Sequence, residues 1–182
     1  MPKFFKSVAL LTSLVLLLPT ASAGGAGPAA MTPGISTAQT SNDTDVLFME
    51  TATMSNLAEI ATSRLALQKS GNTAVRAFAQ MMITDHTKAQ DELNALAVKK
   101  GVKLADKPGA AQRLQSNKLS MLSGAAFDAE YKKVQVGGHD MTLTLIKTYR
   151  SFGKDTDALA YAAKIQPIVA GHLEMAKGLP GE

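Results

Sequence analysis

The amino-acid sequence predicts an all-α protein: an antiparallel bundle of four long helices, with a short extra helix in the connection between the second and the third. From residue 43 onwards, alanine, leucine and methionine are mixed with lysine, glutamate and glutamine, a composition that favours helices over strands. Apolar residues recur there at spacings of three and four, which places them on one face of a helix. Glycines divide the region into long segments, as expected for separate helices.

The N-terminal residues are typical of a secretory signal peptide, which we place over residues 1–23. Lys3 and Lys6 supply the positive start, residues 8–18 form an apolar run, and residues 21–23 provide the small side chains of a cleavage site. The run has about eleven residues, whereas a membrane-spanning helix needs roughly twenty. We therefore expect cleavage after this segment, with an uncleaved anchor as the alternative. The mature protein is then expected to be periplasmic or secreted, with no integral membrane segment.

The composition also excludes several kinds of site. The chain has no cysteine, which excludes disulfides, thiolate metal sites and cysteine nucleophiles. Loss of Lys3 and Lys6 with the signal lowers the formal net charge from +4 to about +2, too little to indicate nucleic-acid binding. No glycine-rich loop follows a strand, and no nucleophile motif of a hydrolase is present. A protein partner or a homo-oligomer stays open.

Between the signal and the bundle, residues 24–42 are rich in glycine, alanine, proline, serine and threonine and contain almost no large apolar residue. Such a segment cannot bury enough surface to offset the entropy of ordering it, so we predict a flexible leader. The bundle is predicted over residues 43–179.

The first two long helices are expected to form a hairpin. The first is predicted over residues 43–69 and the second over residues 73–100, where Gly101 ends it. Only the short break at Gly71 and Asn72 separates them, which makes them antiparallel neighbours.

The second half of the bundle follows an irregular stretch and a short helix over residues 111–122. The third long helix is predicted to continue to residue 152, and the fourth to run from residue 155 or 157, where aspartates suit a helix N-terminus, to residue 177. Pro167 should kink the fourth helix. The residues of the third helix expected to face inward are Phe127, Tyr131, Val134, Met141 and Leu145.

The chain has three histidines, and each falls near the middle of a different long helix: His86, His139 and His172. Glu59 takes the corresponding place in the first helix. At 1.5 Å per residue, Glu59 and His86 differ in height by roughly 5 Å, and His139 and His172 by no more than roughly two turns. We therefore predict a polar layer in which these four side chains meet at one depth.

Two interpretations of this layer stay open. A carboxylate on an apolar face is costly unless it is paired, bound to a cation or neutralised, and neutral imidazoles are good ligands for several transition metals. One transition metal ion (Zn, Cu, Fe or Mn) would then be held by Glu59, His86, His139 and His172. The alternative is a hydrogen-bonded layer without a metal, or one from which His139 turns to solvent. We expect the neighbouring Asp85 to face solvent, with a supporting role behind a histidine as the alternative.

Residues that carry a family resemblance lie on all four long helices: Phe48, Ala52 and Glu59; residues 75–86; residues 124–128 with Tyr131, Gln135 and His139; and Pro167 with His172. Their order and spacing over residues 43–179 resemble the exported bacterial family called domain of unknown function 4142, often labelled a predicted outer membrane protein. That family is regarded as ferritin-like. The resemblance implies a ferritin-like bundle with a crossover in the stretch 101–123, and it implies no particular activity.

The sequence departs from ferritin-like enzymes that hold two metal ions. Those proteins carry two Glu-x-x-His motifs, whereas Ile83 and Val169 stand three residues before His86 and His172. A paired-iron oxidase or an iron store is therefore not expected. The first hypothesis is an exported bundle that binds one metal ion in metal or oxidative stress handling. The alternative is a non-catalytic envelope protein whose polar layer sets helix register. Whether the protein is an enzyme is left undecided.

Overall fold

The structure is a computed structural model that describes residues 35–181, so the predicted signal peptide and part of the predicted leader lie outside the described residues. The described part is helical and contains no strand, which confirms the all-α prediction. None of its helices combines the length and the apolar character needed to cross a bilayer. The elements are the short 3-10 helix η1 (Thr37–Gln39) and the α-helices α1 (Thr44–Lys69), α2 (Thr73–Lys100), α3 (Ala110–Ser120), α4 (Gly124–Phe152) and α5 (Thr156–Lys177).

Local sequence explains where these helices begin and end. Asp43, Asn72 and Asp155 each precede a helix and accept hydrogen bonds from two backbone N–H groups of its first turn. These bonds satisfy donors that have no partner inside the helix. Helix α2 ends at Gly101, whose φ of 66° lies in the left-handed region that glycine adopts without strain.

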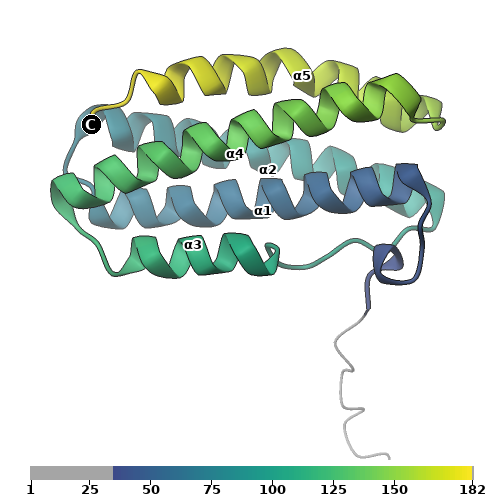
Figure 1. Cartoon of the computed structure of the whole chain (residues 1–182), viewed down its shortest axis with the longest axis horizontal. Helices are drawn as coiled ribbons and strands as arrows, with labels where there is room; N and C mark the ends of the chain where they lie inside the picture. Colours follow the sequence, from purple (N-terminus) through teal and green to yellow (C-terminus); the bar gives the residue numbers. More distant parts are fainter. Residues whose placement is uncertain (1–34, 182) are drawn as a thin grey trace, which may run out of the picture. The chain divides into compact units, whose positions relative to one another are not determined.

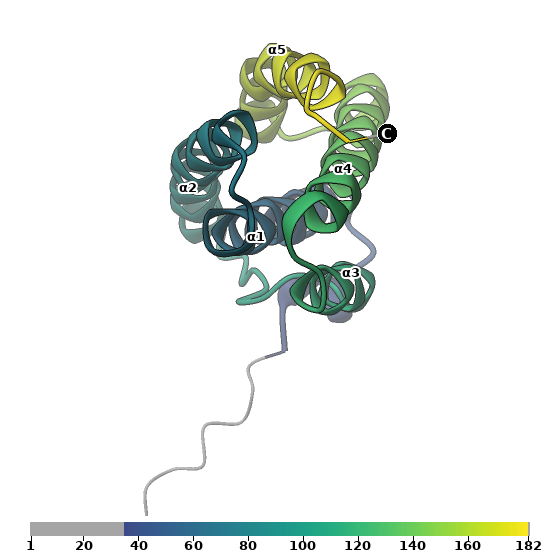
Figure 2. The same cartoon turned by 90° about the vertical axis from the view of Figure 1, so that its left-hand side faces the viewer.

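The four long helices form a bundle with one crossover. Helices α1 and α2 form one antiparallel hairpin and α4 and α5 form the other (Figure 1). The chain between α2 and α4 returns along the bundle, so these two helices run in the same direction (Figure 1). This is the ferritin-like connection. Helix α3 lies within the crossover and packs outside the ring, against α1 and α4 (Figure 2).

The residues just before α1 are held against the bundle. Ser36 Oγ donates to Glu50 Oε1 (2.6 Å), and the backbone N–H of Ala105 donates to Glu50 Oε2 (2.9 Å). Thr37 N–H donates to the carbonyl of Lys103 (2.9 Å). The buried Glu50 therefore ties both the start of the described chain and the crossover to α1. For residues 35–42 the structure differs from the expected flexible leader, because the partners that order them lie outside the segment.

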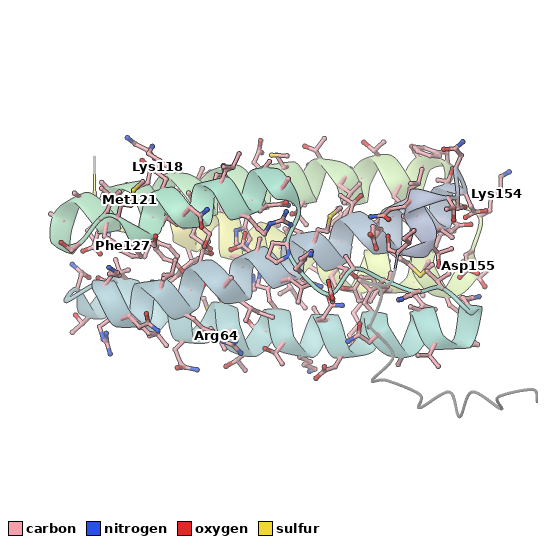
Figure 3. The ribbon with its side chains drawn as sticks, turned by 90° about the horizontal axis from the view of Figure 1, so that it is seen from below. Arg64, Lys118, Met121, Phe127, Lys154 and Asp155 are labelled. Carbon is pink, nitrogen blue, oxygen red and sulfur yellow. The ribbon has the colours of Figure 1, made fainter. Side chains whose placement is uncertain are left out.

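Two apolar clusters fill the bundle, one on each side of a polar layer. Figure 3 shows Phe127 near the end where α3 meets α4, and Lys154 and Asp155 at the opposite end. The cluster near Phe127 also contains Val75, Phe78, Met82 and Tyr131. The other cluster includes Phe48, Leu93, Ile146, Tyr149 and Tyr161.

The buried face of α4 differs in part from the predicted one. Tyr131 is buried as expected, but Met141 is 74% exposed, and Ile146 takes the inward place. The buried face continues from Tyr131 through Gln135 and His139, both of which are polar. The prediction for Met141 was wrong because it followed the apolar residues of this helix and not the histidine.

Candidate functional site

Three helices bring one histidine each to the middle of the bundle. His86 lies on α2, His139 on α4 and His172 on α5, and all three are buried. The ring centroids of every pair are 5.5 Å apart. One nitrogen of each ring lies within 4.8 Å of the others. The structure therefore brings the three predicted histidines together, and His139, at 1% exposure, does not face solvent.

His86 is oriented by an amide of α1. Asn56 Nδ2 donates to Gln90 Oε1 (3.2 Å), which leaves the Asn56 amide oxygen as the acceptor for His86 Nδ1 (3.0 Å). His86 Nδ1 therefore carries the proton, and the lone pair is on Nε2.

The other two histidines are oriented in the same way by different partners. His139 Nδ1 donates to the backbone carbonyl of Gln135, one turn earlier on α4 (2.8 Å). His172 Nε2 donates to the Asp85 carboxylate on α2 (3.0 Å). Such bonds behind a histidine fix its tautomer and raise its basicity as a ligand. Asp85 follows the alternative prediction, a supporting role behind a histidine: its side chain is 39% exposed, and its carboxylate binds His172.

The second nitrogen of each ring has no hydrogen-bond partner. These nitrogens are His86 Nε2, His139 Nε2 and His172 Nδ1. Because each ring donates through its other nitrogen, all three are acceptors, and a buried acceptor without a donor is costly. A cluster of neutral imidazoles with outward-facing N–H groups held by acceptors is the arrangement found around bound metal ions. The site can therefore hold a metal ion through three nitrogens.

Burial keeps these imidazoles neutral. It lowers the pKa of His139 to about 4, despite the opposing bond to the Gln135 carbonyl. Burial lowers the pKa of His86 well below its ordinary value, and repulsion from the other two rings lowers it further. The pKa of His172 is also lowered by burial, against the opposing effect of Asp85. Near pH 7 the rings are thus in the form that binds metals.

Glu59 lies beside the cluster and not within it. Its Oε1 is 3.7 Å from His139 Nδ1, the nitrogen already bonded to the Gln135 carbonyl, and this distance is too long for a hydrogen bond. The set of mutually close ligand atoms contains the three histidines without Glu59. Burial raises the pKa of Glu59 to about 8, with the Gln135 amide opposing the shift. Its carboxyl is therefore mostly protonated near pH 7, which removes the need for a cation partner.

Glu59 lines a small cavity beside α3. This cavity, of about 30 Å³, lies between α1, α3 and α4 and is also lined by Gly138. A Cβ atom on Gly138 would lie 2.7 Å from Glu59 Oε1. A side chain at position 138 would therefore displace the Glu59 carboxyl from its present place.

A larger, partly open cavity of about 200 Å³ adjoins the histidine cluster. His86 and His172 line it together with Asn56 and Asp85. Its remaining lining is mainly apolar: Ala52, Ala89, Ile165, Ile168 and Val169, with Lys88, Glu92, Thr142 and Lys164.

Sequence reasoning missed the polar residues that support the site from α1 and α2. Asn56 and Gln90 are buried within the layer, and Tyr161 OH donates to the carbonyl of Ala89 beside them. Asn56 lies three residues before Glu59, and Gln90 four residues after His86. Polar residues one turn from a suspected site residue, on the same helix face, are the signal that could have identified both.

Comparisons with known proteins place this chain in a family and assign it no function. No curated protein and no solved structure matches this chain. A family profile described as a domain of unknown function, DUF4142, matches residues 30–179. That match spans all five α-helices and includes every residue of the histidine cluster, so this chain belongs to the DUF4142 family.

Proposed function

We propose that this protein binds one transition-metal ion through His86, His139 and His172. The observation that carries the proposal is the set of three buried, unpartnered nitrogens, each on a ring whose other nitrogen is fixed by its own acceptor. Three acceptors without a donor have no favourable partner among themselves, whereas a cation satisfies all three.

The donor set narrows the choice of ion. Imidazole nitrogens suit Zn, Cu and Fe, whereas Mn prefers oxygen ligands, so Mn fits this site less well. Three protein ligands leave a further coordination position for water or a small molecule, as in catalytic metal sites. Asp85 adds a negative charge behind His172, which favours a divalent ion.

The role that fits an exported protein with such a site is metal or oxidative stress handling in the cell envelope. The export part of this proposal depends on the signal peptide predicted over residues 1–23, and the handling part depends on the metal site.

Metal content tests the proposal directly. The mature protein should be purified from its own cells without chelators or an affinity tag, and we expect close to one equivalent of a transition metal. Metal-free protein should melt at a higher temperature when Zn, Cu or Fe is added, because the ion binds the folded form. Absence of metal from the native protein, together with no shift in melting temperature with any of Zn, Cu, Fe and Mn, would contradict it.

Variants separate the site from the rest of the bundle. His86→Gln, His139→Gln and His172→Gln should each lose most of the metal, because each removes one of three ligands. Thr87→Gln changes an exposed neighbour on the same helix and should retain the metal.

A second candidate function is a structural layer in a non-catalytic envelope protein. The bonds Asn56–His86 and Asp85–His172 join different helices, and they would set helix register without any metal. Replacing His86 and His172 together by leucine distinguishes the candidates. Higher stability with a retained cellular role would favour the structural layer, since apolar residues often replace buried polar groups without loss.

A further inference from the structure

The orientation of the Asn56 amide decides whether His86 presents a lone pair or a proton to the cluster. An amide has an oxygen at one end and an NH₂ group of similar size at the other, so either end can face a neighbour. With its oxygen toward His86, Asn56 accepts from Nδ1, and Nε2 keeps the lone pair. With its NH₂ group there, Asn56 would donate to Nδ1. The proton of the ring would then be on Nε2, which could not bind a metal ion.

The metal-free cluster itself favours this second form. His86 Nε2, His139 Nε2 and His172 Nδ1 are buried acceptors without a donor. A proton on His86 Nε2 would remove one of these unpaired acceptors, and it would place a donor beside the other two rings, whose centroids are 5.5 Å away. A group outside the cluster must therefore hold Asn56 in the orientation that leaves Nε2 free.

Gln90, one acceptor of the Asn56 NH₂ group, does not fix this orientation. Its own amide donates to Thr53 Oγ1 (3.3 Å) and to Asn94 Oδ1 (2.8 Å). A hydroxyl both donates and accepts, and Asn94 is exposed, so its amide is free to turn in water. All three side chains can therefore reverse together with Asn56 and keep the same number of hydrogen bonds.

Tyr161 on α5 is the other acceptor of this NH₂ group, and a backbone carbonyl fixes its direction. The Tyr161 hydroxyl donates to the carbonyl of Ala89 (3.2 Å), a group that can only accept. Its oxygen is then the acceptor for Asn56 Nδ2, at 3.5 Å. If Asn56 reversed, Tyr161 would keep only one of these two partners, and the layer would lose a hydrogen bond.

We propose that Tyr161 is a positioning residue for His86: through Asn56 it holds the proton of the ring on Nδ1 and the lone pair in the cluster. Tyr161 is buried, and burial raises the pKa of its hydroxyl to about 12, so the proton that it donates is retained near pH 7. The consequence for metal binding rests on the proposed function, whereas the tautomer of His86 in metal-free protein does not.

The test reads that tautomer from the NMR chemical shifts of the two ring nitrogens of His86, in metal-free protein at about pH 7. Wild-type protein should carry the proton mainly on Nδ1. Tyr161→Phe keeps the ring and removes the hydroxyl, and roughly half or more of the molecules should then carry the proton on Nε2, since one hydrogen bond favours the native form by roughly 2- to 10-fold. An unchanged tautomer in this variant, or a wild-type proton on Nε2, would overturn the proposal.

Two further variants separate the direction of the hydrogen bonds from packing. Tyr149→Phe removes another buried tyrosine hydroxyl of the same apolar cluster, one that is bonded to Asp45, and it should leave the His86 tautomer unchanged. Gln90→Glu supplies a carboxylate, which only accepts, so adding it to Tyr161→Phe should return the proton to Nδ1. A change in Tyr149→Phe as large as in Tyr161→Phe, or failure of Gln90→Glu to restore the tautomer, would overturn the assignment.

Metal binding by the same variants is measured with Zn by titration calorimetry. Tyr161→Phe should bind Zn more weakly by roughly 2- to 10-fold, because only the molecules with a free Nε2 are competent, and Tyr149→Phe should match the wild type. A changed tautomer in a protein that binds no Zn, Cu or Fe would retain the role of Tyr161 and end the proposed function. Zn binding together with an unchanged tautomer in Tyr161→Phe would do the reverse.

Discussion

Each histidine of the cluster is fixed by a different kind of acceptor: a side-chain amide for His86, a backbone carbonyl for His139 and a carboxylate for His172. The carbonyl belongs to a regular helix and cannot be removed by substitution. The carboxylate of Asp85 can be removed by substitution, and it is the only one of the three acceptors that carries a formal charge. Asp85 is therefore the most direct point at which to weaken the site without changing a ligand.

Asp85→Ala should lower metal affinity by roughly 10- to 100-fold, because His172 loses the partner that fixes its tautomer and increases its basicity. Asp91→Ala removes an exposed carboxylate from the same helix and should leave the affinity unchanged. Competition with a chromophoric chelator measures both. Equal affinities of the two variants would show that Asp85 has no part in binding.

Two adjacent glycines of α4 test the position of Glu59. A Cβ on Gly137 meets nothing within 4 Å, so Gly137→Ala should stabilise the protein by about 0.5–1 kcal/mol through helix propensity. A Cβ on Gly138 meets Glu59 Oε1, so Gly138→Ala should stabilise the protein less than Gly137→Ala does, or destabilise it. Urea unfolding gives both free energies.

The same pair can be measured after Glu59→Ala. Without the carboxyl in its way, Gly138→Ala should become about as favourable as Gly137→Ala. A difference between the two glycine variants that persists in this background would mean that Glu59 is not the obstacle.

At the level of the helices, the sequence was sufficient to predict where each long helix begins and ends. It was not sufficient to predict which face of α4 is buried. Asp43, Asn72 and Gly101 act through bonds to neighbouring residues, so their effect can be read locally. The inward face of α4 depends on which polar residues other helices cover, and Met141 was misplaced for that reason. The common depth of the histidines was predictable from residue counts, because helix rise is constant.

The three histidines of the site could be predicted from the sequence, whereas the contacts that they make with neighbouring side chains could not. That Asp85 turns back to reach α5 depends on how closely α2 and α5 approach, which no local pattern specifies. The same holds for the cavity between these helices, and for the side of His139 on which Glu59 lies.

A buried carboxylate of α1, that of Glu50, hydrogen-bonds the crossover. Glu50→Ala would leave the Ser36 hydroxyl and the Ala105 N–H without their acceptor, and it should cost about 2 kcal/mol. Glu50→Gln keeps one acceptor oxygen and should cost less. Hydrogen exchange of the Ala105 amide should accelerate most in the alanine variant. Unchanged exchange there would contradict this role of Glu50.

For the molecule as a whole, the layer makes stability depend on pH in a specific direction. Where burial lowers the pKa of His86, His139 and His172, the unfolded state binds more protons below about pH 6.5, so stability rises with pH up to that point. Glu59, with a pKa raised to about 8, acts oppositely: the folded state retains its proton from about pH 4.5 to 8, so stability falls with pH over that range. Three imidazoles outweigh one carboxyl below about pH 6.5, and above it Glu59 acts alone.

Metal-free protein should therefore be most stable near pH 6.5, as measured by urea unfolding from about pH 4 to 8. Glu59→Gln should remove the decline between about pH 6.5 and 8, and His139→Gln should reduce the rise below it. A wild-type profile that keeps rising to pH 8 would contradict the assignment for Glu59.

The three histidines come from separate stretches of the chain, and the crossover lies between the first and the second. No pair of them is close until the helices have closed around one another, so the unfolded chain has no preformed cage. Uptake of an ion would follow folding and could not guide its early steps. Which ion occupies the protein would then depend on the supply at the place where folding is completed, and not only on the intrinsic order of metal affinities.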